Sequence, residues 1–345
     1  MGRNTRLVGS LLIGVLVATA CSAPRAAAPT ASPAPTGTAA AAGTAAPTAT
    51  PSFEGRTLNI VTGGTGGVYI VYGAGLADVL SKKLKVAASA QQTTASVDNM
   101  KFIGQGKADL AFTLADTAYD ATKGNAPFTD KVDAQTLAVM YGNYTHIVVK
   151  DASGINTIAD LKGKRVSVGA AGSGTEIIAN RIFEALGMDP AKDIQRERLA
   201  AADSANGLRD GKLDAFFFSG GLPTSAILDL ANSVKIRLLS DVDAIKKMSD
   251  KYGPFYVPVK IPAGTYKDVP ETTVSGVQNL LVVNAKFDAA LARAILQTMF
   301  DNKSDLELIH AAAKELTLAT ASVGSPLPFN AGAIDFYKSK GVWKG

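Results

Sequence analysis

Two glycine-rich turns hold the residues of this 345-residue sequence that are best suited to binding chemistry. Residues 62–67 read TGGTGG and residues 172–175 read GSGT, and each turn precedes a segment with helical periodicity. The N-terminus of a helix offers unpaired N–H groups and the positive end of the helix dipole, which suit a carboxylate or a phosphate. One such turn could simply need glycine to bend the chain. Two turns in matching positions could hold one anion from both sides, and the residues expected to do so are Gly64, Thr65, Gly66, Ser173, Gly174 and Thr175.

Five further residues are candidates for the same site, and most of them also have a purely structural explanation. Tyr69 and Tyr141 could supply aromatic walls and hydroxyl groups, or they could pack in the core. Asp116 could orient a ligand, or it could be the N-cap of a helix. Ser219 and Gly220 follow an apolar strand, at the carboxyl end, where open α/β sheets bind their ligands.

The spacing of the motifs argues against an enzyme. Neither turn has the Gly-x-Gly-x-x-Gly order of a dinucleotide site or the Lys-Ser/Thr ending of a phosphate-binding loop. Two histidines and one cysteine are too few for a His/Cys metal cluster, and the sequence has no Gly-x-Ser-x-Gly elbow. We therefore expect no catalysis, no cofactor and no metal. The enzymatic alternative is an extracellular hydrolase that uses Ser173 or Ser219 as its nucleophile.

Short apolar segments alternate with longer segments of helical period, which is typical of a parallel α/β sheet. Ser173 and Glu176 have the spacing of a capping box, which favours a helix start at the second turn. The pattern predicts helices at 68–80, 97–104, 174–186, 289–300 and 305–316. It predicts strands at 57–61, 86–90, 109–113, 146–149, 165–169, 213–218, 236–239 and 277–283.

The N-terminal residues predict export and attachment to a membrane. Residues 1–20 contain two arginines and then an apolar run of about a dozen residues, which is a signal peptide because a membrane span needs roughly twenty. Small residues precede Cys21, as in the bacterial lipobox, so we expect lipid on that cysteine. The rest of residues 21–52 is almost entirely Ala, Pro, Thr, Ser and Gly, which predicts a disordered linker. Residues 53–345 then form the folded domain.

The charge of the folded part does not indicate nucleic acid as a partner. The formal net charge is +5, but three of the arginines lie in the first 25 residues, so basic and acidic residues nearly balance in the folded part. No cluster of Lys and Arg with interleaved aromatic residues occurs.

Several motifs together resemble the TAXI solute receptors of TRAP transporters. They include residues 62–69 (TGGTGGVY), Ser96-Val97-Asp98-Asn99, residues 145–149 (THIVV), residues 160–169 (DLKGKRVSVG), residues 172–176 (GSGTE) and residues 261–266 (IPAGTY). The resemblance spans essentially the whole folded domain. It implies a two-lobed periplasmic-binding fold of the second type, in which lobe 1 comprises about 53–145 and 275–345 and lobe 2 about 146–274. It also implies a ligand site at Ser96 and near the turns already named.

The resemblance further implies a function. Receptors of this family capture a small organic anion, such as a glutamate-like amino acid or a dicarboxylate, and deliver it to a TRAP-type permease driven by an ion gradient. This chain departs from the family pattern at Ala95, where glycine is expected, and in residues 141–145, which lack an acidic residue. We expect an extracytoplasmic receptor, in the periplasm or on the outer cell surface, attached to the membrane through Cys21. A lipid-anchored sensing module with a membrane signalling partner is the alternative.

Overall fold

The computed structural model describes residues 51–345. The predicted signal peptide at 1–20, the predicted lipid attachment site at Cys21 and most of the predicted linker lie outside the described residues. Within the described part, no helix combines the length and the apolar character needed to cross a bilayer.

A mixed ten-stranded sheet forms the centre of the domain, in the order β2-β1-β3-β10-β4-β7-β5-β6, with β8 paired to β4 and β9 to β10. Strands β1, β2 and β3 are parallel, as are β5, β6 and β7, while β10 and β4 run antiparallel to their neighbours. The strands are β1 Thr57–Val61, β2 Ala87–Gln91, β3 Leu110–Leu114, β4 Ala134–Lys150, β5 Arg165–Ser167, β6 Gln195–Glu197, β7 Ala215–Gly220, β8 Ile236–Leu238, β9 Val257–Ile261 and β10 Thr272–Asn284.

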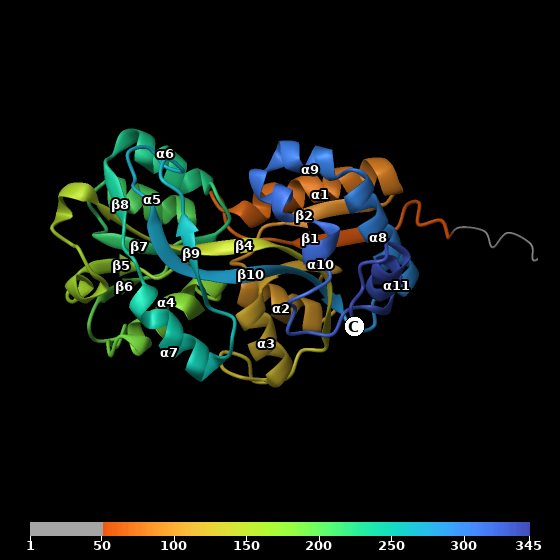
Figure 1. Ribbon diagram of the computed structural model, residues 1–345, viewed down its shortest axis with the longest axis horizontal. Helices are drawn as coiled ribbons and strands as arrows, with labels where there is room; N and C mark the ends of the chain where they lie inside the picture. The colour runs from red at the N-terminus through yellow and green to blue at the C-terminus, as the bar shows by residue number, and fades with distance from the viewer. Residues whose placement is uncertain (1–50) are drawn as a thin grey trace, which may run out of the picture. The chain divides into compact units, whose positions relative to one another are not determined.

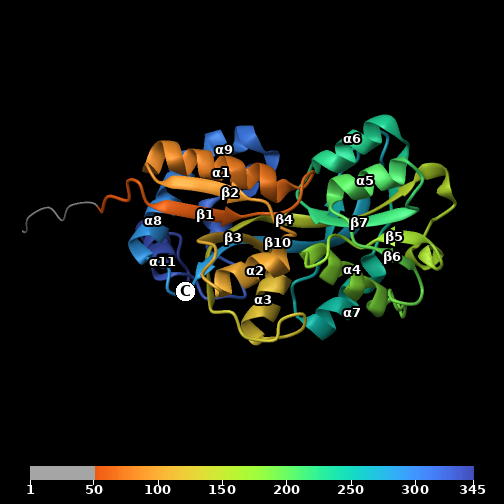
Figure 2. The same cartoon turned by 180° about the vertical axis from the view of Figure 1, so that it is seen from behind.

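Helices cover both faces of this sheet. Figures 1 and 2 show α1, α5, α6 and α9 on one face and α2, α3, α4 and α7 on the other. The α-helices are α1 Val68–Leu84, α2 Ser96–Gly104, α3 Ala115–Lys123, α4 Gly174–Ala185, α5 Ala201–Arg209, α6 Ser225–Ser233, α7 Val242–Tyr252, α8 Ala289–Asp301, α9 Lys303–Ile309, α10 Leu318–Ala321 and α11 Ala331–Ser339. Three short 3₁₀ helices are η1 Asp151–Ser153, η2 Ile158–Leu161 and η3 Ala311–Glu315.

The two long strands β4 and β10 run through the middle of the domain and divide it into two lobes (Figure 1). The first lobe contains β1, β2 and β3 with α1, α2 and α3, and the second contains β5, β6 and β7 with α4, α5 and α6. This confirms the predicted fold class, a two-lobed α/β fold. Strand β4 begins at Ala134, well before the strand predicted at 146–149, so the crossing is longer than the sequence indicated.

The local sequence explains how the helices are placed. Strand β1 ends at Val61, the glycine turn follows, and α1 starts after Gly67. Helix α4 begins after Ser173, whose hydroxyl accepts a hydrogen bond from the Glu176 N–H at 3.1 Å, as the capping-box spacing predicts. Because parallel strands end at the same edge, the turns after β1, β2, β5 and β6 bring four helix N-termini toward the contact between the lobes.

Candidate functional site

A small cavity lies between the two lobes, with a volume of about 50 Å³. Its walls are the turns after β1, β2, β5 and β6, together with the last residues of β3 and β7. Eight of the residues expected to bind ligand line this cavity: Gly64, Tyr69, Ser96, Ser173, Gly174, Thr175, Ser219 and Gly220.

Four helices point their N-termini at this cavity. The N-cap residues of α1, α2, α4 and α5 are Gly67, Ala95, Ser173 and Ala200, and all four line it. Only Ser173 caps its own helix with a side chain, whereas the other three N-caps make no such bond. The first N–H groups of α1, α2 and α5 therefore have no side-chain cap, and the dipoles of all four helices favour a negative charge in the cavity.

Three hydroxyl groups in the cavity can act as donors. Ser96 Oγ accepts from the Leu114 N–H at 3.3 Å, Ser173 Oγ accepts from the Glu176 N–H, and Thr175 Oγ1 accepts from the Ser219 N–H at 3.1 Å. Each oxygen already accepts a bond from a backbone N–H, so each hydroxyl proton can be donated to a ligand. These donors complement the helix N-termini and suit an anion.

The lobes meet tightly around the cavity. A Cβ atom added at Gly174 would lie 2.5 Å from Leu114 Cδ1 and 2.8 Å from Ser96 Oγ, so only glycine lets α4 approach the first lobe this closely. On the same side, the N–H groups of Val97 and Asp98 donate to Gly172 O at 3.2 and 3.4 Å. These contacts join the first turns of α2 and α4 across the cavity.

The cavity lining is neutral. Within residues 51–345, no Lys, Arg, His, Asp or Glu side chain lines it, and no group of three His, Cys, Asp or Glu side chains is placed to hold a metal ion. The arrangement can bind and orient a small anion through hydrogen bonds.

Four of the expected residues lie elsewhere. Gly66 O accepts from the Ala226 N–H at 3.2 Å, and a Cβ at Gly66 would lie 2.8 Å from Ala226 Cβ, so the β1–α1 turn packs against α6 of the second lobe. Thr65 is exposed, and its carbonyl accepts from the Ala202 N–H at 3.4 Å. Tyr141 is buried against Tyr72, with 6.0 Å between ring centroids.

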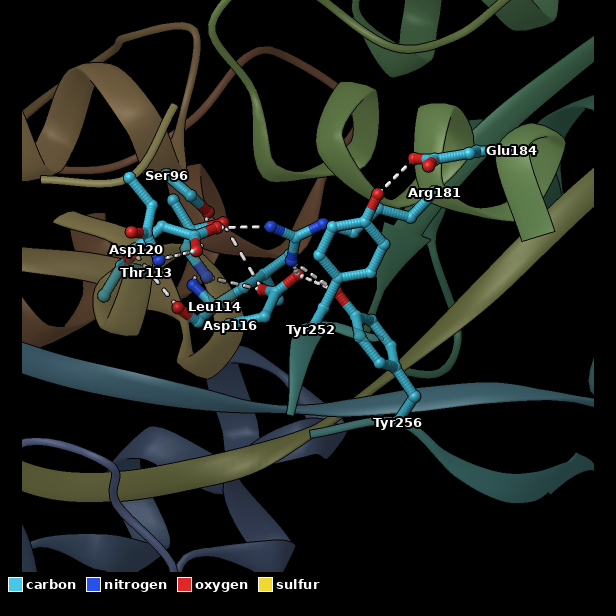
Figure 3. A network of polar contacts seen from close by, with 11 residues as sticks. Ser96, Thr113, Leu114, Asp116, Asp120, Arg181, Glu184, Tyr252 and Tyr256 are labelled. Carbon is cyan, nitrogen blue, oxygen red and sulfur yellow. Dashed lines mark hydrogen bonds and ion pairs between the residues drawn. The ribbon is translucent and has the colours of Figure 1, made fainter. Parts of the chain in front are cut away.

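Asp116 is part of a buried ionic network between the lobes (Figure 3). Its carboxylate accepts from Arg181 Nη1 at 3.2 Å and from the Tyr256 hydroxyl at 2.6 Å, while Asp120 accepts from Arg181 Nη2 at 2.5 Å. Burial raises the pKa of Asp116, and Arg181 and Tyr256 lower it in part. The N-cap of α3 is Leu114, so Asp116 lies in the first turn, two residues beyond the N-cap position suggested by the sequence.

Several residues of the cavity were not among the expected ones. Leu199 and Ala200 line it from the β6–α5 turn and Ala201 from the start of α5, and no glycine or hydroxyl residue marks that turn in the sequence. Ala95 also lines it, with φ 94° and ψ −142°, a conformation that favours glycine. The family resemblance leads us to expect glycine at this position. The alanine of this chain therefore has a strained backbone conformation at the cavity.

One protein family and several solved structures are similar to this chain. The sequence profile of the NMT1-like family matches residues 60–341. A solved periplasmic transporter structure has a TM-score of 0.55 and 13% identity, and the match covers 82% of this chain and 92% of the other. The aliphatic sulphonate binding protein SsuA from Escherichia coli has a TM-score of 0.46 and 17% identity, with 84% and 94% covered. A putative L-cystine ABC transporter from Listeria monocytogenes has a TM-score of 0.48 and 17% identity, with 76% and 96% covered.

Proposed function

Because the chain belongs to the NMT1-like family, we propose that it is a non-enzymatic solute-binding receptor that works outside the cytoplasm. It captures a small organic anion between its two lobes and delivers it to a membrane permease. The resemblance of its motifs to TAXI receptors supports a TRAP-type permease driven by an ion gradient.

The observation that carries this proposal is the convergence of four helix N-termini on one neutral cavity between the lobes. The dipoles of these helices favour a carboxylate, and the hydroxyl groups of Ser96, Ser173 and Thr175 can add hydrogen bonds without any cationic side chain. A ligand that touches both lobes binds the closed form better than the open form, and it therefore shifts the population toward the closed form. The permease would then recognise the closed receptor.

Calorimetry tests the binding step. We expect heat of binding with at least one anion from a panel of carboxylic acids that includes glutamate and dicarboxylates, the first candidates from the family resemblance. The full-length protein must first be freed of any ligand that was purified with it, and mass spectrometry of the released fraction identifies such a ligand directly. Absence of binding for every anion of the panel would contradict the receptor function.

Export and anchoring are the second part of the proposal. Residues 1–20 act as the signal peptide, Cys21 carries the lipid, and the linker up to residue 52 lets the receptor reach its permease. The variant Cys21→Ser should move the protein from the membrane fraction to the soluble extracytoplasmic fraction. Unchanged retention in the membrane fraction would refute the anchor and leave the binding function untouched.

A further inference from the structure

The ring of Phe218 crosses the contact between the two lobes at the wall of the cavity. Phe218 belongs to β7 of the second lobe, and it lines the cavity. A Cβ atom added at Gly67, the N-cap of α1 in the first lobe, would lie 3.2 Å from Phe218 Cζ. The tip of the ring therefore reaches the first lobe beside one of the four helix N-termini.

Glycines make room for this ring on two sides. A Cβ atom at Gly220 would overlap Phe218 Cε1, and a Cβ atom at Gly67 would be in tight contact with Cζ. Both glycines line the cavity. Because protein interiors are close-packed, the ring fills space that a smaller side chain at residue 218 would leave open. The side chain of residue 218 therefore determines how far the cavity extends toward α1.

Phe218 differs from the two phenylalanines that precede it. Phe216 and Phe217 are 0% and 1% exposed and lie in the hydrophobic core on opposite faces of β7. Phe217 packs on Phe183 of α4, with 5.2 Å between ring centroids. Phe218 is only partly buried and packs at the edge of the core that contains Phe216. Its contribution to the core is therefore smaller, and its ring is available to the cavity.

The hydroxyl donors and the Phe218 ring form separate walls of the cavity. Ser173 and Thr175 line it from the start of α4, on the face of β7 opposite the Phe218 ring. They are 5% and 7% exposed, and each hydroxyl accepts a backbone bond but donates none within residues 51–345. Both protons are available to a carboxylate. A carboxylate held there leaves the rest of the acid facing the apolar walls.

Those walls suit an uncharged, short chain. Their side chains are alanines together with Val68, Leu114, Leu199 and Phe218, and no charged side chain of the described residues lines the cavity. A second carboxylate or an ammonium group would lose its hydration there without gaining an ion pair. The volume of about 50 Å³ corresponds to only a few water molecules. A long chain therefore has no room while the Phe218 ring is in place.

We infer that the ligand is a short acid with one carboxylate and an uncharged chain, and that Phe218 is the residue that limits the length of this chain. This inference rests on the proposed receptor function and narrows it, because it predicts that amino acids and dicarboxylates are the weaker ligands.

A series of straight-chain acids tests the inference by calorimetry on the full-length, ligand-free protein. Propionate, butyrate, pentanoate and hexanoate differ only in chain length. We expect hexanoate to bind the unaltered protein at least about tenfold more weakly than the best of the shorter acids, because a chain that is too long overpacks the wall at Phe218. Succinate and alanine add a second charged group, and they should bind at least about tenfold more weakly than propionate.

Substitutions on β7 test the role of the ring. Phe218→Leu and Phe218→Ala remove its tip, so hexanoate should gain at least about tenfold in affinity relative to propionate in both variants. Phe217→Leu is the matched control on the same strand, because Phe217 is buried against Phe183 and does not line the cavity. It should lower the melting temperature more than Phe218→Leu does and leave the order of chain lengths unchanged.

The outcomes separate this inference from the receptor function. An unchanged order of chain lengths in both Phe218 variants would overturn the role of Phe218, as would an equal change in the Phe217→Leu control. If succinate, alanine or glutamate binds the unaltered protein as tightly as the best straight-chain acid, the inference about the ligand is wrong while the anion receptor stands. Failure of every acid, glutamate and succinate included, would overturn both.

Discussion

Arg181 of α4 and Asp116 of α3 form an ion pair across the two lobes, with 3.2 Å between Nη1 and Oδ2. The side chains are 8% and 0% exposed, and Asp120 of the same helix holds the other arm of the guanidinium. The ring of Tyr252 lies 4.1 Å from the guanidinium carbon, measured to the ring centroid. One arginine therefore joins α3 of the first lobe to α4 and α7 of the second.

Replacing Arg181 by methionine should destabilise the domain strongly. The substitution leaves two buried carboxylates without their cation, and such a loss costs about 3–5 kcal/mol of the free energy of unfolding. Urea denaturation measures it. Lys246→Met is the matched control, because the Lys246–Asp250 pair is exposed and should contribute less than about 0.5 kcal/mol. Equal effects of the two substitutions would contradict a special role for the buried pair.

Replacing Ala95 by glycine should stabilise the domain. The φ of 94° at Ala95 is costly for any residue with a Cβ atom, so glycine should raise the free energy of unfolding by about 1 kcal/mol. Ala294→Gly is the control, since Ala294 lies within helix α8, where glycine should lower stability by a similar amount. A loss of stability in both variants would show that the backbone at residue 95 is not strained.

The hydroxyl of Thr175 should contribute to anion binding. Thr175→Val removes the proton that can be donated into the cavity, so affinity for the bound acid should fall about tenfold, whereas Thr175→Ser should retain most of it. Calorimetry with the acid that binds the unaltered protein measures both. Thr298→Val serves as the control, because the Thr298 hydroxyl donates to Ala294 O within α8. Equal affinity of the valine and serine variants would contradict the donor role.

His146 should make the domain less stable in acid. It is fully buried between Phe218 O and the Tyr266 hydroxyl, and burial lowers its pKa from 6.5 to about 4. Below pH 6.5 the unfolded chain binds a proton that the folded chain does not. His146 should therefore reduce the free energy of unfolding progressively between pH 6.5 and 4, by roughly 3 kcal/mol in total.

The variant His146→Gln isolates this effect. Burial raises the pKa of Asp241 to about 6, so Asp241 acts in the opposite direction: the folded chain takes up that proton more readily as the pH falls. Because Asp241 is present in both proteins, the difference between wild type and variant at each pH reports His146. A constant difference from pH 7 to pH 4 would contradict the assignment.

The periodic elements of the fold could be predicted from the sequence. The strand expected at 109–113 lies within one residue of β3, and the helices expected at 68–80 and 289–300 begin where α1 and α8 begin. Strand β4 was predicted only in its second half, because Gly142 and Asn143 separate the apolar run of its first half from that of its second. Helix α5 shows little helical periodicity in the sequence, because it contains glycine and several polar residues. Helix α7 shows more, since its buried residues Ala244, Ile245 and Met248 have helical spacing.

The residues of the site could be predicted only where the residue type itself indicates a binding role. Glycine and hydroxyl residues revealed the turns after β1 and β5, both of which reach the cavity. The alanines of the β6–α5 turn act through their backbone, so their residue type carries no signal. Asp116 was a reasonable candidate from its type, but its partner Arg181 lies 65 residues away in sequence, and only the packing of α3 against α4 brings the two together.

Backbone groups and side chains in the cavity differ in how easily mutation can change them. In the proposed receptor, the dipoles of four helices favour the negative charge, and no single side-chain exchange removes them. The remaining walls are neutral side chains such as those of Leu114 and Phe218, which can vary without removing those helix N-termini. If the chain is the proposed receptor, new specificities can arise, in evolution or in the laboratory, by exchanging these neutral wall residues while the helix N-termini are retained.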